Sequence, residues 1–188
     1  MRKLVIKTIA ITLAIIMAVG TAFYLLLSSF YPSVLASGYF KMNNAELSLK
    51  YSEKAYEKSS EISDLATLTE RSILFEDENK TIKYAVLLIN DEGYQDLIES
   101  KSNGYHYYIV SKLCEAQYNK GDKSVAISTA FNNTLDYTAH NPVHRLILIA
   151  INSNDMQTLT AIKQNLQNKQ NKNELLNEHL SLIEEFLN

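Results

Sequence analysis

The amino-terminal apolar run, Leu4 to Leu27, constrains this chain more than any other feature. The run holds about 24 residues, within the length range of membrane helices, and a single charge, Lys7. Because a helix rises about 1.5 Å per residue, the run reaches about 36 Å and can cross the hydrocarbon layer of a bilayer, which is ~30 Å thick. We therefore expect a cytoplasmic stub and transmembrane helix over residues 1–28, followed by one further domain over residues 29–188.

The charges around the run predict its orientation. Arg2, Lys3 and Lys7 lie at its start, and no charged residue follows until Lys41. Basic residues beside a membrane helix tend to stay in the cytoplasm, so we expect a single-pass protein of the cell membrane with its amino terminus inside and its carboxyl-terminal domain outside. The rival interpretation is a signal peptide cleaved after Ala36. The apolar region of such a peptide is usually about 7–15 residues, shorter than this run.

Small residues recur at every fourth position of the run, at Ala10, Ala14, Ala18 and Ala22. This spacing lets two membrane helices approach closely, so the stripe is a candidate for packing against a second copy of the chain or against a membrane partner. The alternative is that alanine is simply common in such helices. Aromatic side chains, which favour the membrane interface, gather at the outer end of the run; they are Phe23, Tyr24, Phe30 and Tyr31.

Composition limits the class of fold and of partner for the rest of the chain. Gly and Pro are scarce, five and two in all, which argues against an all-β domain with its many turns. The chain has 18 basic and 21 acidic residues, and three of the basic ones precede the domain, which leaves a net charge of about −6 outside the membrane. That balance disfavours nucleic acid and tight docking on anionic lipid. The single cysteine, Cys114, has apolar neighbours, and we predict a buried structural thiol.

Apolar residues recur at three-to-four spacing along the whole external part, which predicts an all-α fold. One helix is expected from about Asn44 to Lys58, and another is expected to be capped by Asp64. At Asn141-Pro142 the sequence predicts a cap followed by proline at the first helical position. Paired helices with short turns are typical of helical repeats.

Residues 113–127 carry a more specific pattern. A large apolar residue is followed by a small one, then by a Gly-Asp turn, then by a small residue and another apolar one: Leu113-Cys114, Gly121-Asp122 and Ala126-Ile127. This pattern resembles the middle of a tetratricopeptide repeat. A looser copy begins at Leu35, about 78 residues upstream, with room for one unit between, so the period is nearer 39 than the family's ~34 residues. The family's Trp is absent. The resemblance implies a short α-solenoid of helical hairpins.

In the tetratricopeptide family the first helices of the repeats line a concave face that binds peptides or protein segments. The resemblance places Tyr108, Ser111, Glu115 and Tyr118 on that face. Their spacing of three, four and three keeps them on one side of a helix. The alternative is that the tyrosine rings cover neighbouring helices and leave only the hydroxyl groups exposed.

Catalytic and metal-binding patterns are missing from the sequence. His140 and His144 have a ligand-like spacing, but the helix expected at Pro142 begins between them, so they do not share a helix face. His179 lies among leucines and is predicted at the edge of the core. We find no phosphate loop, nucleophile elbow or Cys-His signal, and expect no enzyme activity, no metal and no cofactor.

These features together predict a membrane-anchored adaptor, scaffold or assembly subunit of a bacterial cell-envelope complex. It would bind a partner protein through its helical repeats and contact the bilayer through Leu4–Leu27. Two alternatives remain open at this point. One is an accessory subunit of an envelope enzyme that uses acidic residues such as Glu115, and the other is a secreted helical binding module released by signal cleavage.

Overall fold

The computed structural model describes residues 2–134, 141–168 and 174–187, and in this part of the chain it contains eleven helices and no strand. The all-α fold predicted from the sequence is confirmed. The chain divides into two compact units, Met1–Asp64 and Leu65–Asn188.

The first unit contains α1 (Arg2–Phe30), α2 (Pro32–Lys41) and α3 (Ala45–Ser59). Its segment Ile6–Phe30 is long and apolar enough to cross a membrane, and an amino-terminal signal sequence meets the same criteria. The four alanines Ala10, Ala14, Ala18 and Ala22 are exposed on this helix. Their role in helix packing stays a prediction.

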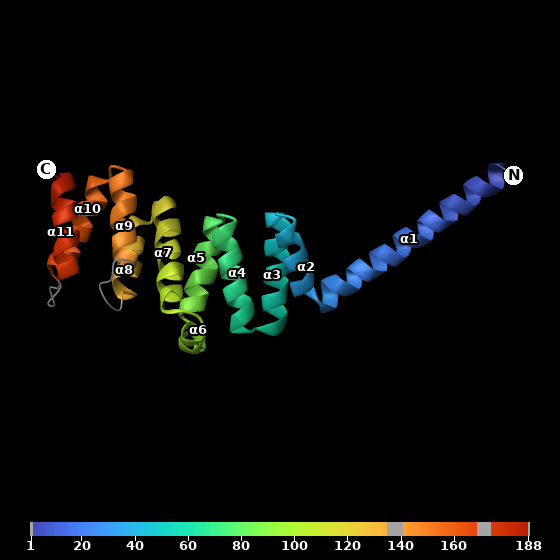
Figure 1. The fold of residues 1–188 in the computed structure, drawn as a ribbon, viewed down its shortest axis with the longest axis horizontal. Helices are drawn as coiled ribbons and strands as arrows, with labels where there is room; N and C mark the ends of the chain where they lie inside the picture. Colours follow the sequence, from blue (N-terminus) through green and yellow to red (C-terminus); the bar gives the residue numbers. More distant parts are fainter. Residues whose placement is uncertain (1, 135–140, 169–173, 188) are drawn as a thin grey trace. The chain divides into compact units, whose positions relative to one another are not determined.

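A proline separates α1 from α2. The amide of Tyr31 still donates to the carbonyl of Leu27 at 2.9 Å, but Pro32 has no N–H with which to continue the helix. The chain therefore turns, and Figure 1 shows α2 leaving the end of α1 at an angle and pairing with α3. Small and polar side chains fill the space between α2 and α3; for example, the Ser48 hydroxyl donates to the carbonyl of Ala36 at 3.2 Å.

Four helix pairs share one turn geometry: α2 with α3, α4 (Ile62–Leu74) with α5 (Glu78–Ile89), α7 (Asn103–Asn119) with α8 (Lys123–Asn132), and α9 (Pro142–Asn152) with α10 (Met156–Gln167). Each turn has one left-handed residue, with φ between 52° and 90°. An Asn or Asp follows it and donates its amide to the carbonyl five residues back, at 2.9–3.0 Å. This is the Schellman arrangement, which ends one helix as the next begins. The four left-handed residues are Asn43, Glu76, Gly121 and Asn154.

The intervals between these turns reveal an internal repeat. Asn43 and Glu76 are separated by the same interval as Gly121 and Asn154, about 33 residues in each case. The middle interval is longer, about 45 residues, because it also contains the short helix α6 (Tyr94–Ser100). A leucine stands eight residues before each left-handed residue. These leucines, at 35, 68, 113 and 146, hold equivalent places in the four hairpins.

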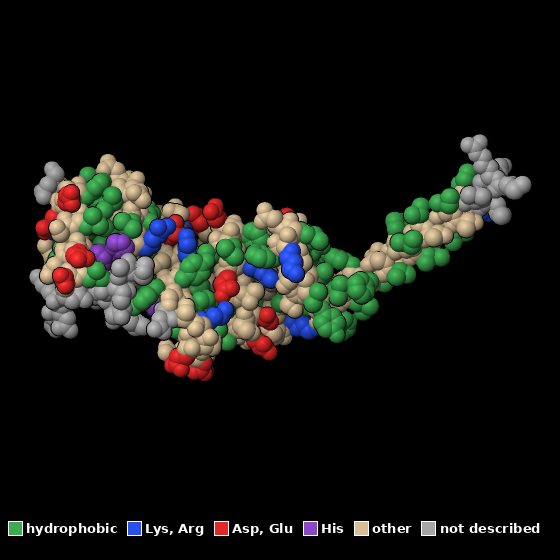
Figure 2. Space-filling view, viewed as in Figure 1, with side chains coloured by type: hydrophobic (Ala, Val, Ile, Leu, Met, Phe, Trp, Pro, Cys, Tyr) green, Lys and Arg blue, Asp and Glu red, His purple; other side chains and the backbone are tan. Residues whose placement is uncertain are grey.

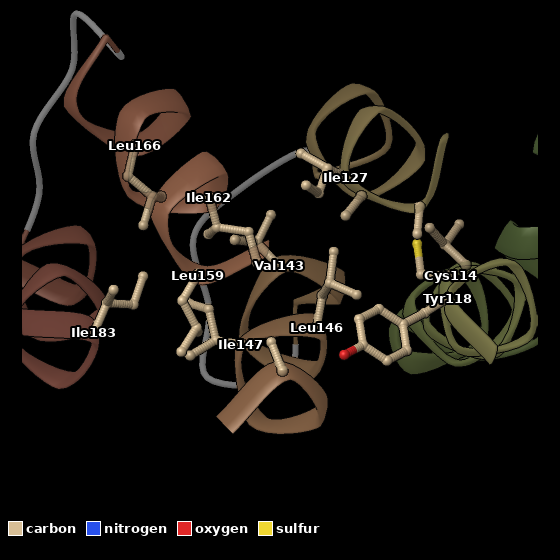
Figure 3. Packing of buried hydrophobic residues seen from close by; sticks show 14 of the residues in the cluster. Cys114, Tyr118, Ile127, Val143, Leu146, Ile147, Leu159, Ile162, Leu166 and Ile183 are labelled. Carbon is tan, nitrogen blue, oxygen red and sulfur yellow. The ribbon is translucent and has the colours of Figure 1, made fainter. Parts of the chain in front are cut away.

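In the second unit, successive hairpins pack against one another. Helix α7 packs against α5, α8 and α9, and α9 packs against α10 and the last helix, α11 (Glu174–Leu187). Aliphatic side chains from α7 to α11 meet in one buried cluster, part of which is seen in Figure 3. Its fully buried members include Val143, Leu146, Ile147, Leu159, Ile162 and Ile183.

The helix starts test three sequence predictions. The helix expected from about Asn44 to Lys58 is confirmed as α3, and the Asn44 side chain caps it by accepting from the amide of Leu47 at 3.0 Å. Asn141 likewise accepts from the amide of His144 at 2.8 Å and precedes Pro142 at the start of α9, which confirms that prediction. The expected cap at Asp64 is wrong. Helix α4 already begins at Ile62, and Asp64 accepts instead from the Ser59 hydroxyl at 2.6 Å.

Candidate protein-binding surface

Helix α7 carries the four residues that the sequence resemblance places on a binding face, Tyr108, Ser111, Glu115 and Tyr118. Ile109, Val110 and Leu113 are fully buried on the sides of α7 that meet its neighbours. Tyr108, at 39% exposure, shares the remaining side with Ser111 and Glu115, which are both half-buried. The helical spacing that placed these three residues together therefore corresponds to a side of α7 that solvent reaches.

Tyr118 lies in a different environment from the other three residues. Its side chain is 7% exposed, and its hydroxyl donates to a carboxylate oxygen of Asp155 at 2.9 Å. Figure 3 shows its ring beside Leu146 within the buried cluster. Tyr118 thus contributes to the core of the second unit, and the exposed surface consists of Tyr108, Ser111 and Glu115 with their neighbours.

A hollow of about 420 Å³ opens at the surface between α7 and α9. Residues from both helices line it: Tyr108, Ser111 and Lys112 from α7, and His144, Arg145 and Leu148 from α9. The two helices contribute residues at equivalent repeat positions. The turn residues of the two hairpins, Gly121 and Asn154, are about 33 positions apart. The same interval relates Ser111 to His144 and Lys112 to Arg145. The internal repeat therefore places side chains of matching position on both walls of one groove.

A second hollow, of about 330 Å³, lies on the other side of the same face of α7. Ile73, Glu76, Glu78 and Thr81 line it from α4, α5 and the turn between them, while Lys112, Glu115, Ala116 and Asn119 line it from α7. Lys112 borders both hollows. We call the two hollows and the α7 face between them the α7 groove.

Glu115 is held between two cations in the α7 groove. Its carboxylate is 2.9 Å from the Lys112 ammonium and 3.3 Å from the Arg145 guanidinium. Partial burial favours the neutral acid, but the bonds from Lys112 and Arg145 outweigh it, so the pKa of Glu115 is lowered. The carboxylate is therefore ionised at neutral pH, and the two cations fix its position across α7 and α9.

Histidine and cysteine side chains take structural positions in the described chain. His144 and His179 contact each other at 2.8 Å between Nδ1 and Nε2, with stacked rings that join α9 to α11. Cys114 is fully buried, as predicted, and burial raises the pKa of its thiol to about 12. Among the residues that the structure describes, no group of three His, Cys, Asp or Glu is placed to hold a metal ion. His140 lies outside the described residues.

No protein-family model, curated protein or solved structure matches this chain. Sequence reasoning missed the α9 side of the groove, namely His144, Arg145 and Leu148. A search at the shorter repeat interval would have found the first two, since they stand at the repeat positions of Ser111 and Lys112.

Proposed function

We propose that this protein is a single-pass, membrane-anchored adaptor or scaffold that binds a partner protein through the α7 groove. It would serve as an assembly subunit of a bacterial cell-envelope complex. The observation that carries the proposal is the groove itself: a part-exposed helix face with hollows on both sides, lined by aromatic, apolar and charged side chains. Such a mixture suits an extended protein segment, which presents both apolar side chains and polar backbone.

The internal repeat supports a likeness to tetratricopeptide proteins. Two of the three intervals between equivalent turns are about 33 residues, close to the ~34 residues of that family. The helices also pack in the order that stacked hairpins require, since α7 contacts both the second helix of the preceding pair, α5, and the first helix of the next pair, α9. In such a stack, first helices such as α7 and α9 would line the binding face.

The position of Ala36 supports an anchor over a cleaved signal peptide. Ala36 lies in the middle of α2, is fully buried, and its carbonyl accepts from the Ser48 hydroxyl. Cleavage there would remove half of α2 from the first hairpin. With Arg2, Lys3 and Lys7 at the start of α1, the proposed topology has the amino terminus in the cytoplasm and the hairpins outside. The mass of the mature protein tests this point, because an amino terminus at Ser37 would contradict the anchor.

The accessory-subunit alternative draws on one specific observation. Three carboxylates, from Glu76, Glu78 and Glu115, line the second hollow of the α7 groove. Glu115 is kept ionised by Lys112 and Arg145, which suits charge recognition better than proton donation. A substrate-binding role for this hollow would require that Glu76→Gln and Glu78→Gln reduce the activity of a co-purifying enzyme without reducing its recovery.

A pull-down from detergent-solubilised membranes tests the adaptor proposal. The full-length tagged protein is compared with the double variant Tyr108→Ala/Arg145→Ala, which changes the groove while Tyr118 stays in the core. Val125→Ala on α8, at a residue 48% exposed and outside the groove, is the matched control. We expect at least one partner to be recovered by the wild type and the control and lost from the double variant. Identical recoveries from all three proteins would contradict a binding role for the groove.

A further inference from the structure

The outer side of α2 is apolar and exposed. Tyr31 is 61% exposed, Val34 56% and Met42 75%. In the hairpin of α7 and α8, the residue equivalent to Tyr31 is Ile109, which is fully buried. Repeat proteins usually end in a hairpin with a polar outer face, because no neighbour covers it. The first hairpin of this chain departs from that rule immediately after its apolar helix.

Side chains of α3 bind the end of α1 and fix where the first hairpin begins. The Lys58 ammonium donates to the carbonyls of Ser29 and Phe30, at 3.2 Å and 3.0 Å, which are carbonyls near the break at Pro32. One turn earlier, the Lys54 ammonium lies 3.4 Å from the Ser28 hydroxyl. The hairpin is therefore attached to the last turns of α1 by several contacts and not only by the chain.

The hydroxyl groups of Tyr24 and Tyr51 also meet, and the Tyr51 ring stacks on that of Tyr39. These side-chain contacts connect α3 to α1 as far back as Tyr24. Tyr24 lies inside the candidate membrane segment Ile6–Phe30. A lipid layer around the last turns of α1 would therefore also reach α3 at Tyr51.

With the hydrocarbon layer beginning at Ile6, the length of α1 places these last turns in the headgroup layer of a membrane. The 25 residues of Ile6–Phe30 extend about 37 Å, whereas the hydrocarbon layer is ~30 Å thick. The excess of about 7 Å corresponds to the final turns, which is the level where tyrosine rings and lysine ammonium groups are favoured. Figure 2 shows hydrophobic side chains gathered where α1 meets α2.

Lysines accompany the apolar side of α2. Lys50, Lys54 and Lys58 are all exposed and four residues apart, so they form a stripe along α3, and Lys41 is exposed at the end of α2. Between Tyr31 and Lys58 the chain has four lysines and three glutamates, so the overall negative charge belongs mainly to the rest of the chain. Lipid phosphates complement such a stripe.

We propose that the outer side of α2 and the lysine stripe of α3 form a docking surface for the lipid headgroups of the bilayer that α1 crosses. Tyr31, Val34 and Met42 enter the interfacial layer, and Lys41, Lys50 and Lys54 contact lipid phosphates. The inference rests on the membrane anchor of the proposed function and adds that the first hairpin lies in the membrane surface. It also revises the expectation from net charge, since the local stripe and not the total sets the attraction to lipid.

Tryptophan fluorescence in vesicles tests the docking surface, because the natural chain has no Trp. Full-length Val34→Trp is reconstituted into vesicles of phosphatidylethanolamine and phosphatidylglycerol, with and without brominated acyl chains that quench nearby indole. Phe23→Trp in α1 reports insertion of the anchor, and Val125→Trp on α8 is the exposed control. Interfacial helices lie roughly 5–10 Å into the headgroup boundary, so we expect Val34→Trp to emit at shorter wavelength than Val125→Trp and to lose about half its emission to bromine.

The three tryptophans separate the possible failures. Quenching of Phe23→Trp without quenching of Val34→Trp would overturn the docking surface and keep the anchor, whereas loss of both would overturn the anchor as well. A Val34→Trp signal that is blue-shifted, unquenched and dependent on protein concentration would assign the surface to a second copy of the chain. Quenching that falls in Lys41→Gln/Lys50→Gln but not in the control Lys80→Gln/Lys120→Gln supports phosphate contacts; equal quenching in both would overturn them.

Discussion

The two compact units use the same hairpin turn but different interiors. In the second unit the hairpins enclose a cluster of fully buried aliphatic side chains that extends from α7 to α11. In the first unit the buried residues of α2 and α3 are mostly small or polar, and Leu49 is the one large aliphatic side chain buried in these two helices. The turn geometry therefore sets the hairpin shape, while the amount of apolar area buried differs.

This difference indicates two sources of stability. A cluster of large aliphatic residues can stabilise the second unit without help, because each buried side chain contributes about 1.5–3 kcal/mol relative to leaving it exposed. The first unit has few such residues, and its tyrosines and lysines bind the end of α1 instead. Under the proposed docking on lipid headgroups, the membrane covers the apolar outer side of α2 that this unit leaves exposed.

The largest expected effect comes from opening the core of the second unit. Leu146→Ala removes a fully buried side chain from α9 and should cost roughly 2–5 kcal/mol of unfolding free energy, through lost burial and the cavity left behind. Hydrogen exchange of α9 and α10 amides in detergent measures the loss. Val125→Ala, at an exposed residue, should change the same amides by less than about 0.5 kcal/mol. Equal effects would remove the distinction between core and surface.

The next largest loss of unfolding free energy is expected at Asp155, which accepts several hydrogen bonds in the second unit. Asp155 accepts from the Tyr118 hydroxyl at 2.9 Å, from the Thr158 hydroxyl at 2.7 Å and from the Lys123 ammonium at 2.7 Å, so it joins α7, α8 and α10. Asp155→Asn should cost about 2 kcal/mol, because these donors lose a charged acceptor in a site only 9% exposed. Asp122→Asn is the control, since Asp122 begins α8 without a side-chain cap bond. Denaturant midpoints compare the two.

The same residue predicts a pH dependence. Burial favours the neutral acid, but the bonds from Lys123, Thr158 and Tyr118 outweigh it and hold the pKa of Asp155 well below its usual range. A lowered pKa means that its contribution is complete above the unfolded value of ~3.9 and is lost as pH falls below it. Stability of the wild type should therefore fall more steeply below about pH 4 than that of Asp155→Asn. If both proteins lose stability equally as the pH falls below about 4, the Asp155 carboxylate does not stabilise the fold in this way.

The histidine pair between α9 and α11 should make folding stability depend on pH in a less acidic range. Burial, with the nearby His144 adding to it, lowers the pKa of His179 to about 4. The folded state then favours neutral His179, so stability is lost as pH falls from the unfolded value of ~6.5 toward about 4. Between about pH 7 and 5.5 the loss should be about 1 kcal/mol, seen as faster exchange of α11 amides. His179→Leu should remove this dependence. If exchange of the α11 amides in His179→Leu still rises with falling pH as in the wild type, His179 is not the cause.

The smallest effect is expected in the first unit. Tyr51→Phe removes the hydroxyl that meets that of Tyr24 and should weaken α3 by about 1 kcal/mol or less, because one hydrogen bond is lost while the ring remains. Tyr56→Phe, at a half-buried tyrosine of the same helix, is the control. Exchange of α3 amides reports the difference. A loss for Tyr51→Phe as large as that for Leu146→Ala would mean that the first unit does not depend on weak polar contacts in the way described.

Most of the helices could be predicted from the sequence, and so could the shared, solvent-reached face of Tyr108, Ser111 and Glu115 on α7. Apolar spacing and caps such as Asn44 and Asn141 act locally, so they place helix starts within a few residues. Spacing also placed Tyr108, Ser111 and Glu115 on one face of α7. Helical spacing puts Tyr118 on the same face of α7, but spacing could not show that the following hairpin covers its side chain. That burial depends on where α9 and α10 pack.

Long-range features were beyond local reasoning. The average period expected from Leu35 and Leu113 combines one shorter and one longer interval between turns, and the insertion of α6 concealed the shorter one. The pairing of His144 with His179 joins residues 35 positions apart, and Arg145 reaches Glu115 across 30. Both depend on how hairpins stack, which is a tertiary property with no signal in residue spacing.

Site-specific photo-crosslinking in intact cells tests the central claim most directly. A benzoylphenylalanine is placed at Tyr108 in the α7 groove, and at Val125 on α8 as the exposed control. The proposed function predicts a crosslinked product of one defined mass from Tyr108 and none of that mass from Val125. No product from Tyr108, or the same product from both positions, would contradict partner binding through the α7 groove.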